Sequence, residues 1–195
     1  SDTETLVESI FYFGLSVVSK FNGMFSFALY DKKESVLYLF RDRLGIKPLY
    51  YFHNSKKILF SSEIKPLIKS NEFDKKINFD AISSYLSFRF NYGVGNYFEN
   101  IQTVEPGTYL KIKNNNLETI KYWNFPSFKN KLEFKEDKLI DELSSTMHEV
   151  LSEHLVSDVP IGSLLSGGLD SSLLTVLMNE IHNNQISTYS ASFDD

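Results

Sequence analysis

The spacing of apolar residues changes several times along the chain, and the first stretch has a helical rhythm. Residues 2–20 carry apolar side chains at intervals of three or four, which gather them on one helix face: Leu6, Ile10, Phe13 and Val17. This spacing predicts an amphipathic helix. Ser1 and Glu4 have the spacing of a capping box, so the Ser1 hydroxyl is expected to cap the helix rather than act as an N-terminal nucleophile.

Short apolar runs separated by polar turns come next, and they predict β-hairpins. Residues 24–30 and 36–40 form one pair of runs, and residues 49–52 and 58–60 form a second pair. The runs are apolar at consecutive positions rather than at every second position. They therefore predict sheets that are covered on both faces.

The middle of the chain mixes both patterns. Two helices are expected at residues 63–70 and 79–88. A last hairpin is expected from strands at 107–112 and 117–122, with an asparagine-rich turn at 114–116. A polar segment with Pro126 then predicts a linker at 124–135. Residues 137–154 return to helical spacing and predict a long helix.

Composition narrows the class of protein. Of the 195 residues, 42% are apolar and 23% are charged, as in an ordinary globular protein. The formal net charge of −5 argues against a general nucleic-acid binder, and no apolar run reaches the roughly 18 residues of a membrane span. The absence of cysteine excludes thiolate chemistry and cysteine–zinc sites, and it indicates a cytoplasmic protein.

A glycine- and serine-rich loop near the end of the chain carries the chemistry. It runs through Ser166, Gly167, Gly168, Leu169, Asp170, Ser171 and Ser172. Residues 159–165 before it form an apolar run of strand length, and residues 169–181 after it have helical spacing. The predicted order is strand, tight turn and helix.

This order predicts an anion site. The first turn of a helix has unpaired N–H groups and a partial positive charge, and glycines let the backbone approach a phosphate. Asp170 would repel a phosphate directly, so it suits a Mg²⁺ ion that bridges to phosphate oxygens. No Gly-Lys-Ser or Gly-Lys-Thr ends the turn, which excludes a Walker loop, and the adjacent glycines disfavour a dinucleotide fingerprint. The plainer alternative is a capped helix after a tight turn.

The loop and its flanks resemble a known family. Residues 158–172 resemble the PP-loop of glutamine-dependent asparagine synthetases. Residues 25–31, 41–51 and 60–65 resemble, in the same order, the second half of the glutaminase domain of that family. The resemblance implies an α/β chain: part of an αββα N-terminal-nucleophile glutaminase domain at 1–123, the linker at 124–135, and the start of a parallel-sheet PP-loop ATP pyrophosphatase domain at 136–195.

The resemblance also implies an activity and its residues. Members of the family amidate aspartate through a β-aspartyl-AMP intermediate, using ammonia from glutamine, with ATP and Mg²⁺. By this resemblance Asp2 binds glutamine, and Asp170 binds the metal ion. ATP binding falls to a set of residues around the loop: Leu165, Ser166, Gly167, Gly168, Asp170, Ser171, Ser172 and Ala191. The implied partners are small-molecule substrates, without nucleic acid or membrane, and a homodimer of the complete enzyme stays open.

The family nucleophile is an N-terminal cysteine, which this chain lacks, so no catalytic residue is assigned. We expect an internal piece of a longer protein that hydrolyses no glutamine alone, exposes sheet edges and tends to aggregate. Arg41, Asp42 and Glu63 are expected to be structural. Three rivals stay open: a β-lactam-forming or peptide-cyclising synthetase, a tRNA sulfur-transfer enzyme, which commonly needs thiols, and an inert chain that only binds nucleotide.

Overall fold

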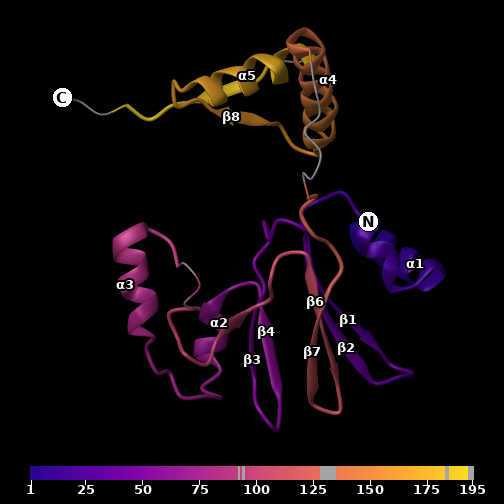
Figure 1. The fold of residues 1–195 in the computed structure, drawn as a ribbon, viewed down its shortest axis with the longest axis vertical. Coiled ribbons are helices and arrows are strands. Elements are labelled where there is room, and N and C mark those ends of the chain that lie inside the picture. Colours follow the sequence, from indigo (N-terminus) through magenta and orange to yellow (C-terminus); the bar gives the residue numbers. More distant parts are fainter. Residues whose placement is uncertain (92, 94, 128–134, 183–184, 193–195) are drawn as a thin grey trace. The chain divides into compact units, whose positions relative to one another are not determined.

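A computed structural model describes residues 1–91, 93, 95–127, 135–182 and 185–192. The chain divides into two compact units, Ser1–Ser127 and Phe128–Asp195 (Figure 1). Most of the linker expected at 124–135 lies outside the described residues, and its first residues, 124–127, have no regular structure.

Over its described residues, the first unit forms two antiparallel sheets. The strands of the four-stranded sheet, in spatial order, are β1 (Ser26–Asp31), β2 (Val36–Arg41), β6 (Thr108–Lys113) and β7 (Asn116–Lys121). Those of the three-stranded sheet are β4 (Ile58–Ser61), β3 (Tyr50–His53) and β5 (Gln102–Thr103). The three predicted hairpins are confirmed as β1–β2, β3–β4 and β6–β7.

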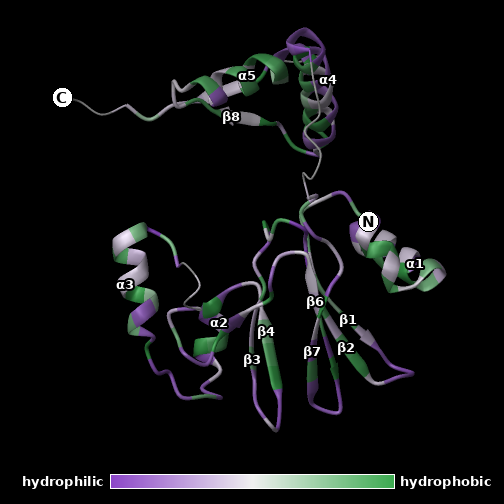
Figure 2. Ribbon diagram, in the orientation of Figure 1, coloured by the Kyte–Doolittle hydropathy of each residue, from purple (hydrophilic) through white to green (hydrophobic). Residues whose placement is uncertain are grey.

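One hydrophobic cluster joins the two sheets. It combines residues of the four-stranded sheet with residues on and beside the three-stranded sheet: Leu39, Leu110, Ile112, Leu49, Tyr51 and Val104. On β2, Leu39 and Phe40 are both fully buried although consecutive side chains point to opposite faces. The prediction that the strands carry apolar side chains on both faces is therefore confirmed for β2. In Figure 2 the strands β2 and β4 carry hydrophobic colour and the hairpin turns are hydrophilic.

Turn residues fix the ends of the hairpins. Asn114 and Asn115 both have positive φ, 51° and 62°, so the β6–β7 turn has the backbone expected of a two-residue hairpin turn. The Asn115 side chain donates to the Asn54 carbonyl at 2.8 Å, and His53 Nε2 donates to the Asn115 carbonyl at 3.0 Å. Asn54 lies in the β3–β4 turn, so these bonds connect the hairpin tips of the two sheets.

The first helix is shorter than predicted. Helix α1 spans Asp2–Phe13 and begins with the predicted capping box, in which Ser1 Oγ accepts from the Glu4 N–H and the Glu4 side chain accepts from the Ser1 nitrogen. Gly14, with φ 74°, ends it, and a 3₁₀ helix, η1 (Leu15–Lys20), follows. The single helix predicted over 2–20 is wrong because a glycine without Cβ adopts the positive φ that breaks the helix.

The helices α2 (Ile64–Lys69) and α3 (Phe79–Phe88) lie where the pattern predicted them. The Asn78 side chain caps α3 by accepting from the Ala81 N–H at 3.2 Å. The strand β5 was not predicted. It has two residues, too few to show any periodicity.

The described residues of the second unit form two helices and two strands: α4 (Glu136–His154), β8 (Gly162–Leu164), α5 (Leu169–Ile181) and β9 (Ser187–Tyr189). The strands β8 and β9 pair in parallel, with Leu164 opposite Tyr189. The strand expected over 159–165 is confirmed only over residues 162–164, in its second half. Pro160, which has no N–H to donate, lies before the paired residues.

Candidate functional site

The glycine-rich loop joins β8 to α5, so the predicted order of strand, turn and helix is confirmed. Gly167 has φ 81°, which an L side chain rarely adopts, and a Cβ built there would meet no atom within 4 Å. Conformation rather than crowding therefore requires a glycine at this position. The space beside it is open.

Backbone donors at the start of α5 stay free. Within the part of the chain that the structure describes, no hydrogen bond from the N–H groups of Leu169, Asp170 or Ser171 is found, and no side chain caps the helix. The Ser172 N–H donates to the Gly168 carbonyl at 3.1 Å and closes the first turn. Leu169 and Asp170 are exposed and Ser171 is partly buried, so these three residues present an array of N–H groups at the positive end of a helix.

Three serine hydroxyls surround this array. Ser171 Oγ donates to the Gly168 carbonyl at 3.1 Å, and Ser172 Oγ donates to the same oxygen at 2.8 Å. Ser166 Oγ lies 3.0 Å from Ser171 Oγ. Because Ser171 uses its one proton on Gly168, Ser166 is the donor in this pair. A bound anion would draw hydroxyl protons from these internal bonds, each worth about 1 kcal/mol.

Asp170 stands in the first turn of α5 and is exposed. Among the described residues no group of three or more His, Asp or Glu side chains could hold a metal ion. Mg²⁺ is commonly held by one or two carboxylates together with substrate phosphates and water. The single Asp170 carboxylate beside free N–H groups therefore fits a metal ion that arrives with a polyphosphate.

The parallel pairing of β8 and β9 brings Leu165 beside Ser190, and Ala191 is the next residue. The Leu165 N–H donates to the Tyr189 carbonyl at 2.9 Å, and Ser190 Oγ donates to the Leu165 carbonyl at 2.6 Å. Both main-chain groups of Leu165 are used, so its side chain is what it can offer a ligand. Ala191 is exposed at the carboxyl end of β9, the edge at which parallel sheets bind ligands.

Asp2, assigned to glutamine by resemblance, lies in the first turn of α1 in the first unit and is exposed. An acidic residue there also stabilises its own helix. The structure thus brings seven of the predicted ATP-site residues onto the β8–α5 loop and the first turn of α5, with Ala191 beside them, whereas Asp2 belongs to the other unit.

Arg41 and Asp42 serve the backbone of the first unit. The Arg41 guanidinium donates to the carbonyls of Lys47, Val104 and Gly45 at 3.0, 2.7 and 2.6 Å. Burial lowers the pKa of Arg41 from its ordinary value, and the neighbouring Asp42 opposes that shift. These contacts agree with the predicted structural role.

Asp42 is 1% exposed, and its carboxylate accepts from three N–H groups. The donors are Leu44, Ile46 and Lys47, at 3.2, 2.9 and 2.9 Å. The Asp42 carbonyl accepts from the N–H groups of Gly45 and Gly107. Glu63, the third residue predicted to be structural, stands at the N-cap position of α2 without a side-chain capping bond.

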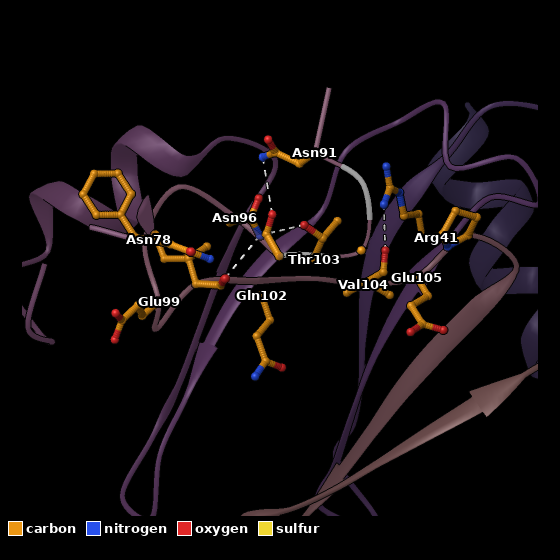
Figure 3. A pocket seen from close by; sticks show the side chains of 14 residues that line it. Arg41, Asn78, Asn91, Asn96, Glu99, Gln102, Thr103, Val104 and Glu105 are labelled. Carbon is orange, nitrogen blue, oxygen red and sulfur yellow. Dashed lines mark hydrogen bonds between the residues drawn. The ribbon is translucent and has the colours of Figure 1, made fainter. Parts of the chain in front are cut away.

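A polar cavity of about 630 Å³ in the first unit was not predicted. Figure 3 shows Asn91 and Asn96 toward one side of it and Arg41 and Glu105 toward the other. Asn96 Nδ2 donates to the Ile101 carbonyl and to Thr103 Oγ1, at 3.2 and 2.8 Å. The polar lining therefore holds the chain around β5. The asparagines at 78, 91 and 96, which line it, are a signal in the sequence that could have indicated it.

Comparison with known proteins decides the family. A family model described as a glutamine amidotransferase domain matches residues 1–123, well over half of the chain. The chain belongs to this glutamine amidotransferase family. A second family model, described as asparagine synthase, matches residues 142–195, which contain the whole glycine-rich loop.

Relatives of this amidotransferase chain align with both of its matched regions. Asparagine synthetase [glutamine-hydrolyzing] 1 of Bacillus subtilis is 36% identical over 194 residues, which cover 100% of this chain and 30% of the relative. A putative asparagine synthetase [glutamine-hydrolyzing] 2 of Methanocaldococcus jannaschii is 34% identical over 199 residues, covering 100% and 38%. The chain therefore spans about a third of the length of these relatives: the glutamine amidotransferase portion and the start of the synthase domain.

A relative with a different name aligns with most of the chain. Amidase chry2 of Gibberella zeae is 30% identical over 184 residues, covering 93% of this amidotransferase chain and 27% of the relative.

No described helix of the chain is long and apolar enough to cross a bilayer.

Proposed function

We propose that the chain is part of an ATP-dependent ligase that amidates aspartate to asparagine with ammonia from glutamine. One observation carries the proposal: the loop from Ser166 to Ser172 presents free N–H groups between a strand and a helix, inside the segment that the asparagine synthase model matches. In this proposal residues 1–123 belong to an αββα glutaminase domain. Residues 136–195 begin a parallel-sheet PP-loop domain, joined by a linker at 124–135.

The loop residues would contact different parts of Mg-ATP. The N–H groups of Leu169, Asp170 and Ser171 bind phosphate oxygens, and the hydroxyls of the three loop serines rotate from their internal bonds toward the same oxygens. Asp170 holds Mg²⁺, which when bound offsets negative charge on the polyphosphate. The Leu165 side chain and the backbone near Ala191 lie beside the adenine. Such an array orients the nucleotide and stabilises the charge that develops on departing pyrophosphate.

The first unit would serve glutamine. Asp2 binds the α-amino group of glutamine by its negative charge, and the ammonia released by hydrolysis replaces AMP on activated aspartate. The thiol nucleophile of this reaction is not among the 195 residues, which contain no cysteine. The proposal includes glutamine, aspartate and ATP as small-molecule substrates and a cytoplasmic location.

Calorimetric titration of Mg-ATP into the 195-residue chain tests the nucleotide site. We expect saturable binding, and we expect Asp170→Ala to weaken it about tenfold, the effect of losing about 1.4 kcal/mol. Without Mg²⁺ the two proteins should bind ATP equally weakly. Asp141→Ala, which removes an exposed carboxylate from α4, is the matched control and should bind like the unaltered chain. Equal weak binding by the unaltered chain and Asp170→Ala with Mg²⁺ present would support the inert alternative.

An amidation with an acceptor other than aspartate is the second candidate, because the relative named an amidase aligns with 93% of this chain. The full-length protein separates the two. Pyrophosphate release that depends on aspartate supports asparagine synthesis. Release that other carboxylic acids stimulate and aspartate does not supports the second candidate.

A further inference from the structure

Two hydroxyl groups connect β8 to α5 beneath the loop. Ser163 Oγ lies 2.9 Å from Thr175 Oγ1, and Thr175 Oγ1 donates to the Ser171 carbonyl at 2.7 Å. Threonine has one hydroxyl proton, so Ser163 must be the donor to Thr175. The result is a directed chain from Ser163 through Thr175 to Ser171. Both hydroxyl residues are partly buried.

This series of hydrogen bonds ends at Ser171, the residue to which the hydrogen bonds of the loop also run. The Ser171 carbonyl accepts from Thr175, while the Ser171 hydroxyl donates to Gly168 and accepts from Ser166. Ser171 is thus held from the helix side and from the loop side. Its N–H is one of the free donors, so the Thr175 hydroxyl helps to hold in place the residue that carries this N–H.

The same hydrogen bonds connect β8, the strand before the loop, to α5, the helix after it. Ser163 is the central residue of β8, and Thr175 lies in the second turn of α5. The other side of β8 is close-packed, because a Cβ at Gly162 would lie 2.8 Å from the Tyr189 ring. Movement of α5 along β8 would break the Ser163–Thr175 bond.

Helix formation alone does not require this hydroxyl. A threonine that bonds back to the carbonyl four residues earlier is neutral or slightly unfavourable for its helix, and valine has a similar shape and propensity. The contact with Ser163 is what distinguishes Thr175. Thr146 on α4 makes the same backward bond, to the Glu142 carbonyl at 2.8 Å, but it is exposed and has no bond to another element among the described residues.

We propose that Thr175 is a positioning residue for nucleotide binding, which together with Ser163 holds Ser171 and the first turn of α5 in the geometry that receives phosphate. The proposal rests on the proposed function, because it takes the loop to be the Mg-ATP site. Thr175 itself acts through Ser171.

The test titrates Mg-ATP into the 195-residue chain and its variants. Thr175→Val should raise Kd about fivefold to tenfold, as expected for one lost hydrogen bond at a preorganised site, and Thr175→Ser should restore Kd to within about twofold. Ser163→Ala should match Thr175→Val, and the double variant should be no weaker than either single variant, because the two hydroxyls act as one unit. Thr146→Val is the control and should leave Kd unchanged.

The outcomes separate this proposal from the proposed function. If Asp170→Ala weakens binding while Thr175→Val and Ser163→Ala do not, the positioning role is overturned and the nucleotide site stands. Ser163→Ala alone decides the point if Thr175→Val fails to fold.

If the unaltered chain binds no Mg-ATP, the proposed function fails, and hydrogen exchange of the free chain decides the positioning role. The Ser172 N–H, which donates to Gly168, should then exchange faster in Thr175→Val and not in Thr146→Val. Unchanged exchange would overturn the role.

Discussion

The loop at residues 42–48 in the first unit and the loop at 165–168 in the second share several features. Each follows a strand, contains a glycine with positive φ and has an aspartate in or just beyond it. In the first loop the buried Asp42 carboxylate takes three backbone N–H groups. In the second, Asp170 is exposed and neighbouring N–H groups stay free. An aspartate beside a glycine turn thus supports the fold where it faces inward and can serve a ligand where it faces water.

The largest expected effect is the loss of the inward carboxylate. Asp42→Ala leaves three N–H groups without their acceptor inside the protein, so the free energy of unfolding of the first unit should fall by about 3–5 kcal/mol. Urea unfolding followed by fluorescence of Trp123, the single tryptophan, reports on this unit.

Asp31→Ala is the control for this change. Asp31 accepts from two turn N–H groups, at 2.9 and 3.0 Å, but in an exposed hairpin turn. Its removal should cost about 1 kcal/mol. Similar losses for the two variants would show that burial of the Asp42 carboxylate adds nothing to its contribution to stability.

Alanine at the two loop glycines should separate strain from crowding. Gly45→Ala places a Cβ 2.7 Å from Pro106 Cγ at φ 69° and should destabilise the first unit by about 3 kcal/mol. Gly167→Ala meets open space at φ 81°, so only conformational strain of about 1 kcal/mol applies to the second unit.

Unfolding in urea checks both glycine variants, with Trp123 fluorescence for the first unit and hydrogen exchange of the α4 and α5 N–H groups for the second. A larger loss at Gly167 than at Gly45 would contradict the openness of the second loop.

A smaller effect is expected at Tyr122, whose hydroxyl donates to the Arg41 carbonyl at 2.6 Å. Tyr122→Phe should cost about 1 kcal/mol at neutral pH. Burial raises the pKa of Tyr122 to about 12, with a further contribution from Asp42. An unfolded tyrosine ionises near pH 10, so the stabilisation is complete below about pH 10 and is lost as the pH rises toward 12.

Alkaline unfolding curves check the sign of this effect. The unaltered chain should lose stability over that interval more steeply than Tyr122→Phe. Parallel curves would contradict the assignment to Tyr122.

The smallest change in stability is expected at Ser172. Ser172→Ala removes one donor to the Gly168 carbonyl, which keeps the Ser172 N–H and the Ser171 hydroxyl. The unfolding free energy should change by about 0.5 kcal/mol or less, while Kd for Mg-ATP should rise about threefold. Ser152→Ala on α4 removes a hydroxyl that also bonds four residues back, at 2.7 Å, and should leave Kd unchanged. A loss of stability without a change in Kd would assign Ser172 to the fold alone.

Much of this arrangement follows from local pattern. The hairpins, the capping box and the passage from β8 to α5 were predictable, because apolar spacing and turn residues lie next to the elements they control. The break at Gly14 was not, because the apolar spacing of residues 2–20 continues through a glycine whose φ is not written in the sequence.

Contacts between distant residues escaped prediction at the site as well. The Leu165 backbone bonds to Tyr189 and Ser190, and this depends on which strands pair. The bond from Ser163 to Thr175 depends on which face of α5 packs on β8. No spacing within one element encodes them. The resemblance to asparagine synthetases gave the residues of the loop, and the structure gave the directions of their hydrogen bonds.

The bonds among His53, Asn54 and Asn115 carry a consequence for the evolution of the first unit. They couple two reverse turns that belong to different sheets and lie some sixty positions apart in sequence. Lengthening one turn would pull the other out of register with it, so insertions at these tips should occur in pairs or be accompanied by loss of the asparagine. Homologues that change one hairpin turn alone would need different contacts between the two sheets.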